Sequence, residues 1–512
     1  MAAFVTDQFR ILNAGSFVDS ISNNSYYAFL GLSNPTATGF GRNTDWNTST
    51  ANNPIDNYDY LSHYRDTSLF GKKITSENVR RVVKKYDWIS NTPYDMYRHD
   101  YRDGKPSPAS DAERLYSANY YVVTSEYKVY ICIENGSSGP TPTISGSTQE
   151  PNHTDIEPVS YSDGYRWKYL YKISPADIIK FDSTEYITLP NNWSTSTDSE
   201  IQSIRDGGNS DSNSNQIKTV YIEKGGSNYA SSFNADIIGD GVGATATVTV
   251  ESGTITKVIV TNGGYGYTYG SVKMPTSGTT SGTGAKLIPI IPPSRGHGFD
   301  IYQELGADKV LLYARFDDST KDFPTDTKFS QVGVIKNPET FSSTGKRTGV
   351  TYTANTFSSL YSIAIDDDNF NPNIGDKITQ NIDGVGIAKG YVASYDKDSK
   401  ILKYYQDRSL SYGYEGGIDQ THSDDTEKIV SFVSSQGITV NNVDVSIDTN
   451  VDGTNTITTS DGKVINLDVT FTEGLANPEI NKKTGDIIYI DNRPIVQRDS
   501  KQKEDVKIIL EF

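Results

Sequence analysis

The chain has 512 residues, with 35 Tyr and 43 Gly against one Cys and three Met. This length allows about two to four domains, and the composition predicts strands and loops in place of a leucine-rich helical enzyme. The formal net charge of −17 leaves no general basic stripe for phosphates, so direct binding of nucleic acid is not expected. No apolar run approaches the roughly 18 residues of a membrane span and the N-terminus lacks a secretory signal, so we expect synthesis in the cytoplasm and no membrane contact.

Residues 74–88, ITSENVRRVVKKYDW, predict one amphipathic helix in the otherwise β-rich first 200 residues. Ser76 can cap the first turn of this helix. Val79, Val82 and Val83 repeat at helical spacing, and basic residues gather toward the C-terminal end, as the helix dipole prefers.

The segment EPVSYSDGYRWKYLYKISP, residues 157–175, predicts a turn followed by an aromatic strand. Its aromatic residues recur at a period of two, which places them on one face of the strand, and such a face needs a partner sheet or a partner subunit to cover it. These residues are Tyr165, Trp167, Tyr169 and Tyr171. Cys132 lies in another alternating run, YKVYICIEN, and is predicted to be a small buried apolar side chain.

Residues 198–216 are rich in Ser, Asn, Asp and Gly and predict a linker. An internal repeat follows, because the segment from Ile217 returns from Ile255 at an offset of about 38 residues. The matching positions are Gly225-Gly226 with Gly263-Gly264, Tyr229 with Tyr267, and the run Gly243–Val250 with Gly284–Ile291. A single hairpin cannot bury its apolar face alone, so the two copies predict one small β domain.

Residues 341–472 predict an all-β region in which strand patterns alternate with turns. The turns are expected at Asn373–Asp376, Asp383-Gly384, Asp452-Gly453 and Asp461-Gly462. The stretch 375–407 suggests a small barrel-like unit within this region. The last 28 residues then give two apolar runs that enclose a turn, with a turn expected at DNRP, residues 491–494. The second run, Val506–Phe512, is expected to close a sheet built elsewhere in the chain.

Few residues carry a pattern that indicates chemistry. Asp448, Asn450 and Asp452 resemble the opening of a calcium loop, but position twelve is Thr459 in place of the usual Glu, which favours a plain β-turn. The run Asp366–Asp368 favours a solvated loop. The five His residues, at positions 63, 99, 153, 297 and 422, have no zinc-site spacing, and the Gly-rich stretches lack a phosphate-loop ending. We therefore expect no catalytic residue, cofactor or metal, and a protein that is not an enzyme.

Several segments, taken in their order along the chain, resemble the baseplate wedge subunit of contractile-tailed bacteriophages, the gene product eight family. The clearest matches are DGYRWKYLYKI, EYITLP at residues 185–190, and GDIIYIDNRP followed by the apolar terminal strand. VTDQFRILNAGSFVDS near the start, KKYDWISNTPYDMYRHD at residues 84–100 and FSQVGVIKNPE at residues 329–339 add to the likeness.

The resemblance implies a layered β-sandwich core that forms a homodimer, contacts other wedge subunits in the virion baseplate and helps to transmit the signal for tail contraction. It places the core in residues 1–205, 296–340 and 473–512. The repeat domain at 206–295 and the barrel-like domain at 341–472 are then insertions. The expected interface-bearing or fold-bearing residues are Trp88, Tyr94, Tyr165, Trp167, Tyr169 and Arg493, with Asp491 as the nearest acceptor for the arginine. The aromatic residues have an alternative role, which is to fill the protomer's own core.

Two other classes of protein remain open. One is a tail-associated adhesin, in which the inserted β-modules bind host surface glycans through their Tyr and Asn side chains. The other is a cell-wall hydrolase, which no nucleophile, metal or acid–base motif supports.

Overall fold

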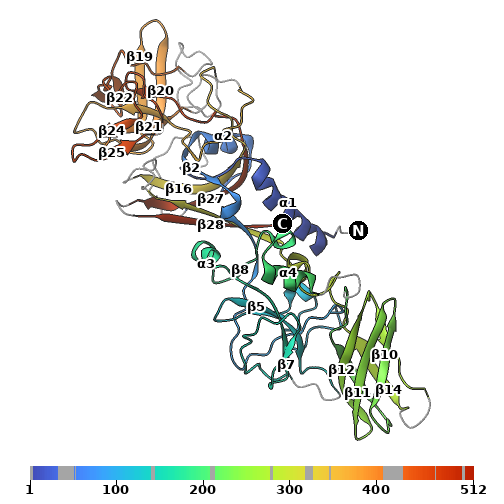
Figure 1. Cartoon of the computed structure of the whole chain (residues 1–512). Coiled ribbons are helices and arrows are strands. Elements are labelled where there is room, and N and C mark those ends of the chain that lie inside the picture. Colours follow the sequence, from blue (N-terminus) through green and yellow to red (C-terminus); the bar gives the residue numbers. More distant parts are fainter. Residues whose placement is uncertain are drawn as a thin grey trace. The chain divides into compact units, whose positions relative to one another are not determined.

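The computed structural model describes residues 4–512 except for 33–50, 52, 140–143, 208–213, 277–280, 318–326, 345–346, 407–429, 468 and 499–501. Strands dominate the described chain, and many of its sheets are built from antiparallel pairs (Figure 1). The predicted fold class, mainly β with few helices and a sandwich-like character, is confirmed. The chain forms two compact units: unit 1 comprises Met1–Val18, Arg80–Leu311 and Ile509–Phe512, and unit 2 comprises Asp19–Val79 and Leu312–Ile508.

The elements that lie wholly or partly in unit 1 are α1 (Asp7–Asn23), β3 (Val79–Lys84), η2 (Leu115–Ser117), β4 (Tyr121–Val123), β5 (Lys128–Asn135), β6 (Val159–Ser160), β7 (Tyr165–Lys172), α3 (Pro175–Phe181), β8 (Tyr186–Thr188), η3 (Trp193–Thr195), α4 (Ser199–Asp206), β9 (Val220–Ser227), β10 (Phe233–Gly239), β11 (Val242–Glu251), β12 (Thr254–Tyr265), β13 (Gly270–Val272), β14 (Thr283–Pro289), α5 (Ile301–Leu305), β15 (Lys309–Phe316) and β28 (Glu504–Glu511).

The remaining elements belong to unit 2. They are β1 (Tyr26–Gly31), α2 (Tyr58–Asp66), β2 (Ser68–Ile74), η1 (Ser76–Asn78), β16 (Lys328–Lys336), β17 (Thr356–Phe357), β18 (Tyr361–Ala364), β19 (Lys377–Ile382), β20 (Gly386–Asp396), β21 (Ile401–Tyr405), β22 (Ile438–Val440), β23 (Val443–Val445), β24 (Thr456–Thr458), β25 (Val464–Asn466), β26 (Leu475–Ala476) and β27 (Asp486–Gln497).

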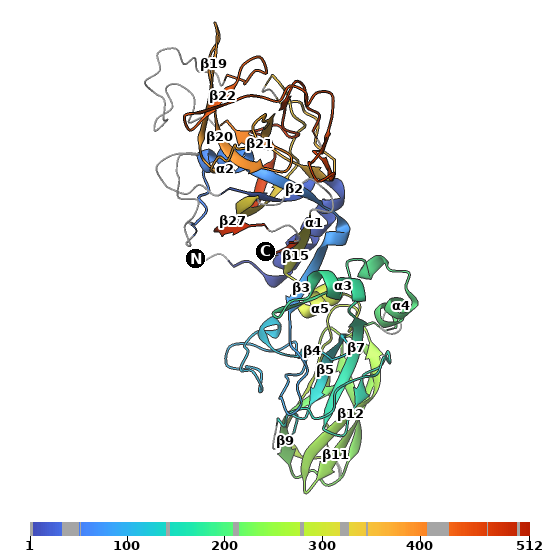
Figure 2. The same ribbon diagram turned by 90° about the vertical axis from the view of Figure 1, so that its left-hand side faces the viewer.

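Described residues of unit 1 form two apolar cores that matter for the candidate site. The larger core surrounds the sheet β4-β5-β7-β6, which carries the aromatic strand and Cys132. Cys132 is fully buried, as predicted, and burial raises the pKa of its thiol well above the usual value. The second core belongs to the repeat, whose strands form the sheets β12-β11-β10-β13 and β14-β9 (Figure 2).

The internal repeat is visible in backbone geometry. Gly226 and Gly264 both have positive φ, at 69° and 58°. A Cβ at Gly264 would lie 2.6 Å from Ala244 N, and one at Gly226 would lie 2.6 Å from Ala285 N, so each position requires glycine for the same reason. The first strand of each copy pairs with the last strand of the other, β9 with β14 and β12 with β11. The domain limits 206–295 and 341–472 remain predictions.

Unit 2 contains a five-stranded sheet, β17-β2-β1-β16-β27, and a seven-stranded sheet, β23-β22-β19-β20-β21-β18-β26. In the first sheet the ring of Phe357 lies over Gly71, where a Cβ would come within 2.2 Å of the ring, so this close approach requires glycine. In the second sheet β19 to β21 form a meander, and the predicted turn at Asp383-Gly384 joins its first two strands with Gly384 at a φ of 71°.

The predicted helix at residues 74–88 is wrong. The segment forms a short 3-10 turn, Ser76–Asn78, and then strand β3. Val82 and Val83 pair with Thr188 and Ile187 of β8, and β-branched side chains pack well in such a ladder, which outweighs their helical spacing.

The predicted linker at residues 198–216 is also wrong in part, because it begins with helix α4. The Asp198 carboxylate accepts hydrogen bonds from the backbone N–H groups of Glu200 and Ile201, and Ile204 is buried. Asp198 is therefore the N-cap of α4, although the polar composition of the segment favours a linker. Residues 208–213 of the predicted linker lie outside the described residues.

The C-terminal prediction is confirmed in one respect and wrong in another. Strand β28 lies beside β15 in a four-stranded sheet, so the terminal segment joins a sheet built elsewhere in the chain. The expected turn at DNRP is instead a bulge within β27: Asn492 pairs with Gln331 and Val496 with Phe329, so Arg493 and its two successors face a single residue of β16. Pro494 has no N–H for the ladder, which suits a bulge.

Candidate functional site

The aromatic residues of β7 lie in the interior of unit 1. The rings of Tyr165 and Trp167 are stacked, with centroids 5.6 Å apart and planes 10° apart, and Tyr94 meets the indole edge-on at 5.8 Å. Tyr169 is equally buried. This packing agrees with the alternative that the aromatics fill the protomer's own core.

The polar ends of Trp88, Tyr94 and Tyr165 are satisfied inside the same unit, whereas the indole N–H of Trp167 has no hydrogen-bond partner among the described residues. The Tyr94 hydroxyl accepts from the backbone N–H of Ile89 at 2.6 Å, and the Trp88 indole donates to Ser147 Oγ at 3.1 Å. The Tyr165 hydroxyl accepts from Tyr94 N at 3.1 Å. Burial raises the pKa of both tyrosines, so they remain neutral donors. These contacts hold the core together, and an interface role for these side chains remains a prediction.

Arg493 differs from the aromatic residues because its side chain is 62% exposed. Its Nε lies 2.6 Å from Asp491 Oδ2, so the acceptor named from the sequence is the one that the guanidinium contacts. Two residues apart on one strand, the two side chains share a face of β27 with Tyr489. This face offers an exposed charged group next to an aromatic ring.

A cavity of about 420 Å³ in the described part of unit 1 lies between the aromatic sheet and the repeat. Two of its charged lining residues contact each other and the repeat. Arg166 Nη1 lies 3.4 Å from Glu134 Oε1, which also accepts from Thr219 Oγ1 at 2.7 Å, and Arg166 donates to Lys218 O at 2.9 Å. These contacts join the repeat to the aromatic sheet. The charges of Glu134 and Arg166 therefore offset each other, and Lys257 also lines the cavity.

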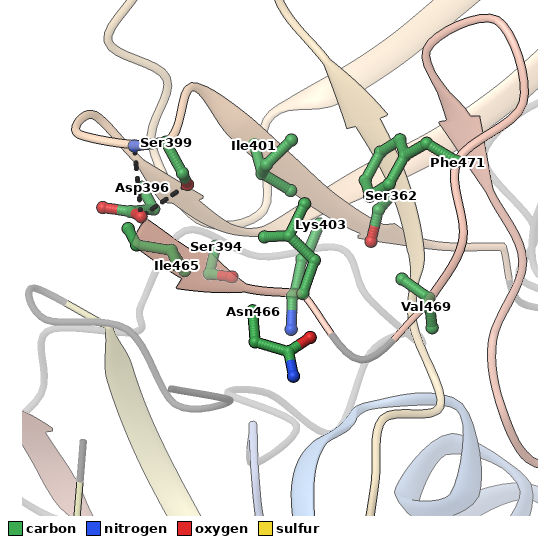
Figure 3. A pocket seen from close by; sticks show the side chains of 11 residues that line it. Ser362, Ser394, Asp396, Ser399, Ile401, Lys403, Ile465, Asn466, Val469 and Phe471 are labelled. Atoms are coloured by element: carbon green, nitrogen blue, oxygen red, sulfur yellow. Dashed lines mark hydrogen bonds between the residues drawn. The ribbon is translucent and has the colours of Figure 1, made fainter. Parts of the chain in front are cut away.

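A smaller cavity in unit 2 lies on the polar side of β20 and β21 (Figure 3). The Ser399 hydroxyl and backbone N–H donate to the Asp396 carboxylate, and burial raises the pKa of this acid. The volume of about 20 Å³ accommodates about one water molecule. This space is too small for a substrate.

A buried charged cluster in unit 1 escaped the sequence reasoning. His297 Nδ1 contacts Glu304 Oε1, and Gly298 N donates to Glu304 Oε2 at 2.7 Å, with the histidine ring edge-on to Tyr97. Nearby Lys168 donates to Ile156 O at 2.7 Å, and burial lowers the pKa of its amine to about 8. No motif links these positions, because a loop and helix α5 bring them together. The contacts tie the loop before α5 to the helix.

The candidate cation ligands make hydrogen bonds of their own. Asp448 Oδ1 accepts from Asn450 N at 3.0 Å, as expected of a turn, and Asp452 Oδ1 accepts from the more distant Glu473 N at 3.0 Å. Asp368 pairs with Lys400. Among the described residues no three His, Cys, Asp or Glu side chains gather in a way that could hold a metal ion; His422 lies outside this part of the chain.

The described part of the chain thus contains a buried aromatic core, contacts that join the repeat to the aromatic sheet, and an exposed strand face around Arg493. No helix in it is long and apolar enough to cross a membrane. Comparison with known proteins does not place the chain in a family: no family model matches it, and no curated protein sequence matches it.

Proposed function

We propose that this chain is a structural virion protein, a baseplate wedge subunit of a contractile phage tail. In this role it forms a homodimer, contacts neighbouring wedge proteins and helps to transmit the contraction signal. It acts through interfaces and carries out no reaction. It is assembled in the host cytoplasm and remains in the tail.

The observation that carries the proposal is where the resembling segments lie in the fold. DGYRWKYLYKI forms β7, EYITLP contains β8, FSQVGVIKNPE contains most of β16, and GDIIYIDNRP begins β27. Each of these strands is paired within a sheet. The likeness therefore follows elements that build the framework, which supports descent from a common framework more than chance similarity between loops.

Labelling of particles tests this proposal. Antibodies raised against the purified chain are added to tailed particles of the virus that encodes it, and gold-labelled secondary antibodies are located by electron microscopy. Gold at the end plate below the sheath is the expected result. Gold confined to fibre tips, or particles that never carry gold although their baseplates are exposed, contradicts the proposal.

Replacing Arg493 by Ala is expected to impair particle assembly more than folding. The Arg493–Asp491 pair is exposed, and exposed pairs contribute only about 0–1 kcal/mol to folding. A guanidinium on an exposed strand face can instead bind a carboxylate or carbonyl of a neighbouring subunit. Denaturant unfolding of the variant and its incorporation into particles in a complementation assay provide the two measurements. An equal loss of folding stability and of incorporation into particles would contradict the interface role. Lys336→Ala, on the neighbouring strand β16, is the control.

One observation favours the second candidate function, an adhesin that binds host surface glycans. At one end of the repeat, Tyr265 is 41% and Tyr269 63% exposed, and Val242 pairs with Tyr265 across the strands. Asp240 accepts hydrogen bonds from the backbone N–H groups of Thr268 and Tyr269, which fixes the loop. Exposed tyrosines offer an apolar ring and a polar tip, as sugar recognition requires.

The first copy of the repeat provides a matched control for this site. The positions equivalent to Tyr265 and Tyr269 are Ser227 and Ser231. If the tip binds glycans, the full chain binds a glycan array and Tyr265→Ala/Tyr269→Ala loses at least about tenfold in affinity, which is about 1.4 kcal/mol. Ser227→Ala/Ser231→Ala retains binding. An array without any bound glycan, or equal losses in both variants, contradicts the adhesin.

A further inference from the structure

Helix α1 and the residues just before it carry an exposed apolar face. Phe4 is 77%, Val5 50%, Phe9 53% and Leu12 65% exposed. Val5, Phe9 and Leu12 stand at the spacing i, i+4, i+7, which aligns them on one side of a helix that Thr6 initiates by accepting from Phe9 N. Four large apolar side chains within nine residues are unusual on a surface that water covers.

The opposite side of the same helix holds it against unit 1. Ile11 and Ala14 are buried, and Ile11 belongs to the main apolar core of the unit. Asp7 pairs with Arg114, and the ring of Phe17 lies 5.5 Å from that of Phe512. The helix is therefore fixed on the surface with apolar side chains on both sides, and only one side is covered.

The exposed face carries no formal charge between Val5 and Ser16. Asp7 is turned to its ion pair with Arg114, and the Ser16 hydroxyl donates to Leu12 O at 3.0 Å, so covering this serine leaves no donor unsatisfied. Two copies of a chain with a net charge of −17 repel each other, so a contact between copies requires a surface without acidic side chains.

We propose that this face, defined by Phe4, Val5, Phe9, Leu12 and Ser16, binds the same face of a second copy of the chain. Two antiparallel helices related by a two-fold axis that passes between Phe9 and Leu12 place Phe9 of each copy against Leu12 of the other. Val5 then meets Ser16. The patch is self-complementary in this register, as a two-fold interface requires.

The area of the patch suits a dimer core. A Phe side chain offers roughly 150–250 Å², so the four exposed side chains together present on the order of 400 Å². A stable interface buries about 800 Å² per partner, of which the centre is apolar and the rim polar. The face supplies the centre, and polar groups around it supply the rim. The inference rests on the proposed function for the dimer and names the surface through which that dimer forms.

Light scattering coupled to size exclusion tests the inference on the full chain at several concentrations. The wild-type protein is expected at about twice 56.4 kDa. Phe9→Glu/Leu12→Glu is expected as a monomer at concentrations at least tenfold above those at which the wild type dimerises. Ile179→Glu serves as the matched control, because Ile179 is also an apolar helical residue of unit 1 and is 74% exposed, but stands outside the patch.

The outcomes separate the inference from the proposed function. A wild type and a double variant that are both dimers overturn the inference and leave the dimer in place. A wild type that is monomeric throughout overturns the inference too, whereas gold labelling of particles still decides the baseplate role. Circular dichroism confirms that the variants are folded. As a second measurement, Leu12→Cys is treated with a short thiol-specific crosslinker, which joins two copies only if these helices meet, since the native Cys132 is buried.

Discussion

Replacing Trp167 by Ala is expected to lower the free energy of unfolding of unit 1 by about 3–5 kcal/mol. The indole is fully buried, stacked on Tyr165 and met by the edge of Tyr94, so truncation leaves a large cavity and removes two aromatic contacts. Denaturant unfolding monitored by tryptophan fluorescence measures the loss, because Trp88 and Trp193 also lie in unit 1 and report on it after Trp167 is removed.

Two further variants make this prediction specific. Trp167→Phe keeps a ring in the stack and removes an indole N–H that has no hydrogen-bond partner among the described residues, so it is expected to cost less than half as much as the alanine variant. Tyr269→Ala removes an exposed ring and is expected to change stability by no more than about 0.5 kcal/mol. A Trp167→Ala protein with full stability but reduced self-association would place the indole at an interface instead.

The sequence predicts strands best where side-chain alternation and burial agree. Tyr165 to Tyr171 alternate at a period of two and form β7 as expected, and the Gly-Gly repeat recurs as two copies of one backbone geometry because a positive φ leaves little choice of residue. Cys132 is buried together with both of its neighbours, because β5 is covered on both faces. Such features are local, so the amino acids alone are sufficient to identify them.

The sequence-based predictions fail where tertiary contacts determine the secondary structure or bring distant residues together. Val79, Val82 and Val83 have helical spacing, but pairing with β8 makes them a strand. Helix α1 was not predicted, because apolar residues on both of its sides obscure the amphipathic pattern that a surface helix normally shows. The contact between His297 and Glu304 depends on how a loop folds back on α5, which no local pattern encodes.

The predicted aromatic interface illustrates the same limit. A period of two shows that Tyr165 and Trp167 share a face, but it cannot say whether another sheet of the same chain or another subunit covers that face. In the fold, this face lies in a core that also contains residues between Tyr94 and Asn135, together with Tyr221 and Ile290 of the repeat. Among the described residues, the face of α1 is an apolar surface that remains uncovered, and the proposed contact between copies lies there.

Acidification from pH 6.5 to pH 4 is expected to destabilise unit 2 by up to about 3 kcal/mol through His63 alone. This residue of α2 is 1% exposed, with its ring edge-on to Tyr405, and burial lowers its pKa from 6.5 to about 4. Between these two values the unfolded chain binds a proton that the folded chain does not, so stability falls as the pH falls, by about 1.4 kcal/mol per pKa unit. Below pH 4 both states are protonated and this contribution stops changing.

Comparison of the wild type with His63→Phe isolates this contribution. The phenylalanine keeps an aromatic ring against Tyr405 but cannot be protonated, whereas the carboxylates that titrate in the same range remain in both proteins. Chemical unfolding of both proteins at pH 7, 6, 5 and 4 should therefore give free-energy curves that converge or cross as the pH falls, with the wild type losing up to about 3 kcal/mol more than the variant. Parallel curves would mean that the imidazole is protonated inside the fold at a pH near its unfolded value, which a site so fully removed from water does not permit without a compensating charge.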